Sequence, residues 1–153
     1  MNLRLNLATL QKFARLWIGL FIYGLGLALM LRAAIGLSPW DVFAQGLSKT
    51  FGITYGWASV IVSALVLLAW IPLKQRWGIG TVLNGIFIGL FADFWLPLVP
   101  QIEGYWLQLL VFLVGMVVVA IATGMYISAG LGSGPRDGLM IGTQRLLGWK
   151  FWK

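Results

Sequence analysis

The chain contains no cysteine and no histidine, and only four of its 153 residues are acidic: Asp41, Asp93, Glu103 and Asp137. Without cysteine there are no disulfides or thiolate metal sites, and without histidine neither a zinc site nor a serine–histidine triad can be assembled. Because so few side chains can carry proton or electron chemistry, we expect no enzymatic activity, no metal and no cofactor.

Apolar residues dominate what is present. They make up 60% of the sequence, charged residues make up 10%, and the mean hydropathy is +0.91. Soluble domains average about 45–50% apolar and about 25% charged residues. The composition therefore predicts an integral membrane protein whose main partner is the lipid bilayer. The net charge of +7 does not indicate nucleic-acid binding, because the basic residues lie between apolar segments and form no stripe.

Four stretches can cross a bilayer, which needs about 20 apolar residues for each span. They are Trp17–Ala34, Trp57–Leu73, Ile79–Leu98 and Trp106–Ala129. The expected fold class is an all-α polytopic membrane protein with four transmembrane helices and short helices that follow the first and the fourth of them.

The basic residues indicate how these spans are oriented. With a cytoplasmic N-terminus, only Arg32 and Lys49 of the 11 basic residues lie outside. The others lie inside: Arg4, Lys12, Arg15, Lys74, Arg76, Arg136, Arg145, Lys150 and Lys153. Since positive charge gathers on the cytoplasmic side, we predict that both termini are cytoplasmic.

A short motif occurs twice, each time after a long apolar run. Gly36-Leu-Ser-Pro39-Trp-Asp41 recurs 96 positions later as Gly132-Ser-Gly-Pro135-Arg-Asp137. Equivalent positions in the two copies are three spans apart. Because three is an odd number of crossings, the two copies run through the membrane in opposite directions, as in inverted-repeat transporters. We expect a first repeat over residues 1–98 and an incomplete second repeat over residues 99–153. A truncated chain is the favoured explanation and loss of the second half is the alternative, and completion by a second copy in a homo-oligomer stays open.

Small residues spaced by four predict close helix packing within these repeats. Such spacing lets helix backbones approach in lipid, and it suggests that the first and fourth spans pack together or against equivalent partners. The predicted packing residues are Gly24 and Ala28 in the first span, Gly85 and Gly89 in the third, and Ala120 and Gly124 in the fourth.

Each motif has the pattern of a helix start. Gly36 or Gly132 would end the preceding helix, and Ser38 or Gly134 would be the N-cap. Proline then fits the first helical position, and the aspartate suits the positive end of the helix dipole. A helix of about ten residues would follow and end near Gly52 or Gly148.

These motif helices have two alternative placements. In the favoured one the helix lies in the interface and Asp41 only caps it. In the other, two half-helices re-enter the membrane and direct their N-termini toward a polar or anionic solute. The candidate solute-binding residues are then Arg32, Ser38, Asp41, Arg136 and Asp137. Arg32 is expected to reach the outer headgroups, and its alternative is a pairing with Asp41.

The stretches GLGLALMLRAAIGLSPWDVFAQGLS, GIGTVLNGIFIGLFAD and TGMYISAGLGSGPRDGLMIG are similar to a known family. Together they resemble the YczE/YitT-type (YczE/YyaS/YitT) bacterial integral membrane proteins of unknown function. The resemblance covers about residues 16–149 and implies a multi-pass protein of the plasma (inner) membrane, with members that are longer at the C-terminus. It implies no catalytic or binding residue.

Two functions remain open from the sequence. The leading one is a small-solute transporter or channel built on the inverted repeat, which is an inference from architecture. The alternative is a structural or regulatory membrane protein in which the motifs only cap helices.

Overall fold

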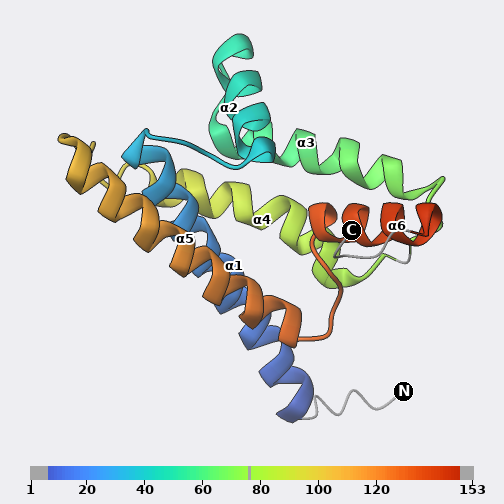
Figure 1. Cartoon of the computed structure of the whole chain (residues 1–153). Helices are drawn as coiled ribbons and strands as arrows, with labels where there is room; N and C mark the ends of the chain where they lie inside the picture. The colour runs from blue at the N-terminus through green and yellow to red at the C-terminus, as the bar shows by residue number, and fades with distance from the viewer. Residues whose placement is uncertain (1–6, 76, 149–153) are drawn as a thin grey trace.

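A computed structural model describes residues 7–75 and 77–148, and within these it contains six α-helices and no strand (Figure 1). The helices are α1 (Leu7–Ala33), α2 (Pro39–Phe51), α3 (Tyr55–Trp70), α4 (Ile79–Trp95), α5 (Tyr105–Ser128) and α6 (Pro135–Leu147). The predicted all-α class is therefore confirmed. Of the basic residues used above for orientation, Arg4, Arg76, Lys150 and Lys153 lie outside the described residues.

Two of these helices, α1 with 27 residues and α5 with 24, are long and apolar enough to cross a membrane. The bent pair α2 and α3 passes the same criterion if it counts as one span, with an angle of 120° between its two helices. The third predicted span corresponds to α4, whose 17 residues fall short of the usual length of about 20. By length and composition the described chain thus has two or three spanning helices, fewer than the four expected.

The long helices α1 and α5 pack side by side and run antiparallel (Figure 1). Glycines permit this close approach. A Cβ atom on Gly19 would lie 3.0 Å from the backbone nitrogen of Tyr126, and one on Gly115 would lie 3.0 Å from the carbonyl oxygen of Gly26. The expected pairing of the first and last apolar segments is present, through small residues that bring the backbones together.

Helix α4 covers a different face of α1 and also contacts α3. Gly24 and Ala28 on α1 are buried, and a Cβ on Gly24 would lie 2.6 Å from the Cβ of Phe91 on α4. Gly85 and Gly89 on α4 lie at close contacts with α3, where a Cβ on Gly89 would lie 2.6 Å from a carbonyl oxygen of α3. These four predicted packing residues all lie between helices.

The packing prediction for α5 needs correction. Ala120 and Gly124 are exposed, and nothing lies within 4 Å of a Cβ built on Gly124. The contact with α1 uses Gly115 and Ala122 instead. The predicted line of Ala120 and Gly124 therefore does not pack within the described residues, because α1 lies against another side of α5.

Helix α6 lies alongside α3 and also contacts α4 (Figure 1). The buried Trp70 at the end of α3 joins them, since its indole Nε1 donates a hydrogen bond to the carbonyl oxygen of Pro135 at 3.0 Å. Gly138 makes room for the indole ring, because any Cβ at that position would overlap the ring. The start of the second motif is thereby fixed against the end of α3.

The two motif helices have the predicted ends. Each begins with a proline, and each ends at a left-handed glycine, Gly52 or Gly148, with a φ of 65°. The prediction that Gly36 ends α1 is wrong, because Ala34 takes the left-handed conformation there with a φ of 56°. After α5 the equivalent position is Gly130, with a φ of 67°.

We predict that Gly115→Leu lowers the free energy of unfolding by about 1–3 kcal/mol, the usual cost of overpacking. A side chain at this position meets Met30 and the backbone of α1. Gly124→Leu places the same side chain on the open face of the same helix and serves as the control. The measurement is thermal unfolding of both purified variants in detergent, and equal losses would contradict the α1–α5 contact.

Candidate functional site

The carboxylate of Asp41 is the centre of a buried polar cluster. The residue is 2% exposed and accepts three side-chain hydrogen bonds. Ser38 Oγ donates to its Oδ2 at 2.5 Å. Tyr55 Oη and Arg136 Nη1 donate to its Oδ1 at 2.9 Å and 2.7 Å. These donors come from the N-cap of α2, from the first turn of α3 and from α6.

The bond to Arg136 is an ion pair that joins the two motifs across the sequence. The Arg136 side chain is 19% exposed and that of Asp41 is 3% exposed. A buried charge is costly unless it is paired and hydrogen-bonded, and here both conditions are met. The interpretation of Asp41 as only a helix cap is therefore wrong, because it also holds the second motif against the first.

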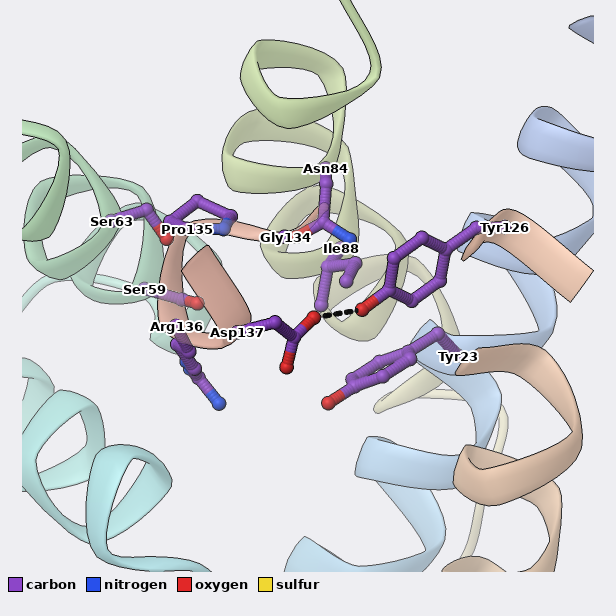
Figure 2. Close-up of a pocket in the computed structure, with 10 residues that line it drawn as sticks. All are labelled: Tyr23, Ser59, Ser63, Asn84, Ile88, Tyr126, Gly134, Pro135, Arg136 and Asp137. Atoms are coloured by element: carbon purple, nitrogen blue, oxygen red, sulfur yellow. Dashed lines mark hydrogen bonds between the residues drawn. The ribbon is translucent and has the colours of Figure 1, made fainter. Parts of the chain in front are cut away.

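The second motif places its own aspartate differently. Gly134 occupies the N-cap of α6, so this helix has no side-chain cap. Asp137 Oδ2 accepts a hydrogen bond from the hydroxyl of Tyr126 on α5, at 2.5 Å (Figure 2). The two aspartates thus occupy the same position in their helices, but one is bound by three donors and the other lies beside a cavity.

This cavity lies among side chains of α1, α3, α4, α5 and α6 (Figure 2). Its lining residues are Tyr23, Ser59, Ser63, Asn84, Ile88, Tyr126, Gly134, Pro135, Arg136 and Asp137. A volume of about 30 Å³ is open to the centre of a water molecule. Because one water needs about 10–15 Å³ on this measure, the space suits water or another very small polar species.

Asn84 adds an unused donor to the cavity wall. The residue is 6% exposed, and its Nδ2 is the one buried side-chain nitrogen or oxygen without a hydrogen-bond partner among the described residues. A buried amide without a partner is costly, so a bound polar group would stabilise it.

Four of the five candidate solute-binding residues lie in this region. Ser38, Asp41 and Arg136 form the cluster, and Asp137 lines the cavity next to Arg136. Arg32 lies elsewhere, because its Nε and Nη2 donate to the carbonyl oxygen of Leu96 at 3.1 Å and 2.6 Å. The alternative pairing of Arg32 with Asp41 is therefore wrong.

Sequence reasoning missed the tyrosines of the site and two of its serines, Ser59 and Ser63. Tyr55 and Tyr126 each bond to a motif aspartate, and Ser59 and Ser63 lie on the α3 side of the cavity. Their position inside apolar segments could have identified them, since a hydroxyl group within an apolar helix usually needs a hydrogen-bond partner. The spacing of the sequence does not identify those partners.

We predict that Asp41→Asn lowers the free energy of unfolding by about 3–5 kcal/mol, because it leaves the guanidinium of Arg136 without its counter-charge. The double variant Asp41→Asn/Arg136→Gln should recover part of this loss, and the two single effects should fail to add by about 0.5–3 kcal/mol. Denaturant unfolding in mixed micelles measures both quantities. Exposed Lys49→Gln is the control, and fully additive single effects would contradict the ion pair.

The chain is 39% identical over 133 residues to the "Uncharacterized membrane protein YczE" of Bacillus subtilis (strain 168), a match that covers 86% of this chain and 62% of the relative. An uncharacterized protein of Haemophilus influenzae is 36% identical over 135 residues, which are 88% of this chain and 62% of that protein. The chain thus spans less than two thirds of the length of these two relatives.

A third relative is the "Uncharacterized protein YyaS" of Bacillus subtilis (strain 168), 31% identical over 135 residues, with 86% of this chain and 67% of the relative covered. No solved structure gives a significant match. The profile of DUF6198, described as a family of unknown function, matches residues 10–153. Since both motifs fall inside that match and YczE and YyaS are relatives of this chain, the resemblance found in the sequence is confirmed, and the chain belongs to the DUF6198 family.

Proposed function

We propose that this membrane protein of the bacterial plasma membrane moves a small polar solute across the bilayer, and that it is not an enzyme. The solute would bind where the N-termini of α2 and α6 meet. The observation that carries the proposal is the buried pair of Asp41 and Arg136 beside a polar cavity. Ionisable groups inside a membrane helix bundle are costly, and they typically mark solute or ion pathways.

Reciprocal contacts between α1 and α5 support an inverted repeat. The sequence offset of 96 relates Gly19 to Gly115 and Met30 to Tyr126. A Cβ on Gly19 would touch Tyr126, and a Cβ on Gly115 would touch Met30. Exchanging each residue for its counterpart reproduces the contact, which is the behaviour expected around a two-fold axis. Between antiparallel helices, such an axis lies in the membrane plane.

The depth of the site follows from the predicted orientation of the chain. With both termini cytoplasmic, the first motif begins outside and the second begins inside. Yet Asp41 and Arg136, in the first turns of α2 and α6, are 2.7 Å apart, so the segments that lead into these helices would bring the two N-termini together within the membrane. The angle of 120° between α2 and α3 fits a re-entrant half-helix followed by a longer one. Irregular backbone at such depth needs protein or a water-filled cavity around it.

The groups around the cavity indicate the class of solute. Asn84 offers a free N–H donor, the uncapped N-terminus of α6 offers backbone N–H groups, and Asp137 offers a carboxylate acceptor. A compact molecule with both hydrogen-bond donors and acceptors satisfies all three. The small cavity admits only a small solute unless the helices move apart.

We expect Asp137→Asn to reduce solute flux by about tenfold, a change of about 1.4 kcal/mol in the barrier. The amide oxygen still accepts from Tyr126, so the variant removes the charge and keeps the shape. The measurement is stopped-flow swelling of proteoliposomes in urea, formamide, glycerol and acetate. Thr123→Val is the control, because its hydroxyl bonds only within α5. If none of these solutes enters faster than in protein-free vesicles, transport of this class is contradicted.

One observation favours the structural or regulatory alternative. All three donors to Asp41 come from this chain, so the carboxylate needs no solute to be satisfied. In that case the ion pair only clamps the two motif helices. Vesicles with normal unfolding stability of the protein but no solute flux would support this alternative.

A further inference from the structure

One face of α1 is covered, whereas the equivalent face of α5 is open. On α1, Gly24 meets Phe91 of α4, and Phe21 stacks edge to face on the same ring, with centroids 5.2 Å apart. The offset of 96 assigns these positions to Ala120 and Val117 on α5. Ala120 is exposed and Val117 is 59% exposed. Within the described residues, no helix packs on this face of α5 in the way that α4 packs on the equivalent face of α1.

The motif helices differ in the same way. On α6, a Cβ on Gly142 would lie 3.0 Å from the Gln75 side chain, which follows α3. Its counterpart on α2 is Gly46, which has nothing within 4 Å. The α6 position that faces Trp70 is Gly138, and its counterpart on α2 is Val42, which is 54% exposed. Helix α3 therefore covers a face of α6 whose equivalent on α2 is uncovered.

We define the open faces as Val42 and Gly46 on α2 together with Val117, Ala120 and Gly124 on α5. These residues are apolar or small. The counterparts of Val117 and Ala120 are covered by α4, and those of Val42 and Gly46 are covered by the end of α3 and the loop after it. The counterpart of Gly124 is Ala28, which is buried on α1. Small residues at such a face permit close backbone contact with another helix. The faces therefore fit a helical partner with the same form as the α3–α4 hairpin.

We propose that a second hairpin of the α3–α4 type docks on these open faces, with its first helix on α2 and its second on α5. The partner is apolar and carries an indole or similar donor that bonds to the carbonyl of Pro39, as Trp70 bonds to that of Pro135. This arrangement would give both motif helices the same support. It depends on the repeat and not on transport, so failure of the flux experiment leaves it standing.

The lengths of the relatives leave room for such a partner. The 133 matched residues are 62% of YczE, so more than a third of that protein lies outside the match. That remainder exceeds two helices of about 20 residues each. The proposed occupant is therefore a hairpin formed by the part of such a longer relative that lies outside the match, and lipid or a second copy of this chain are the competing occupants.

Co-purification tests the proposal with a matched pair of variants. The tagged chain is co-expressed with the remainder of YczE as a separate polypeptide, and the recovered partner is quantified. Ala120→Trp should lower the recovery about tenfold, because the indole overfills the contact. Val114→Trp should leave it unchanged. Val114 is 46% exposed, and its counterpart Ile18 remains 50% exposed on α1 although α4 is docked there.

Both altered residues are exposed in the chain itself, so neither variant should disturb its folding. Retention of the partner by the unaltered chain and by Val114→Trp, with loss in Ala120→Trp, supports the hairpin. No retention by the unaltered chain overturns the proposal in favour of lipid, and so does equal retention by both variants. A differently tagged second copy of this chain that is retained and then lost in Ala120→Trp also overturns it, in favour of a dimer.

Discussion

The buried ion pair between Asp41 and Arg136 is the constraint on which the arrangement of the two motifs depends. Opposite charges attract strongly where water is excluded, but each would be costly to bury alone. The pair is tolerated because Ser38 and Tyr55 supply two further hydrogen bonds to the carboxylate. Separating the motif helices would leave a charge unpaired in an apolar interior. The N-termini of α2 and α6 are therefore held together, and the polar cavity lies beside this junction.

Packing of the long helices supplies the frame for that junction. Apolar surface gives no selective drive between helices in lipid, so α1 and α5 depend on close backbone contact at Gly19 and Gly115. The indole of Trp70 then fixes the start of α6 against the end of α3. Dispersion contacts set the distances between helices, and a few buried hydrogen bonds set their register.

Local features of this fold were predictable from the sequence, and relations between distant segments were not. The starts and ends of α2 and α6 follow from proline, aspartate and glycine at fixed positions, which act over one turn of helix. The partner of Asp41 lies 95 residues away, and helix periodicity does not identify it. The prediction of which face of α5 meets α1 is wrong for a related reason. Small residues lie on more than one side of α5, and only tertiary packing selects among these sides.

The central claim is that the two motifs meet at this ion pair within the bilayer. Solid-state NMR measures it directly, through the dipolar coupling between ¹³C-labelled aspartate carboxyl groups and ¹⁵N-labelled arginine guanidinium groups of the protein in lipid bilayers. A short-range coupling that disappears in both Asp41→Asn and Arg136→Lys is the predicted result, since these residues are 2.7 Å apart. No coupling assignable to this pair, as for motifs held at opposite membrane surfaces, would contradict the account.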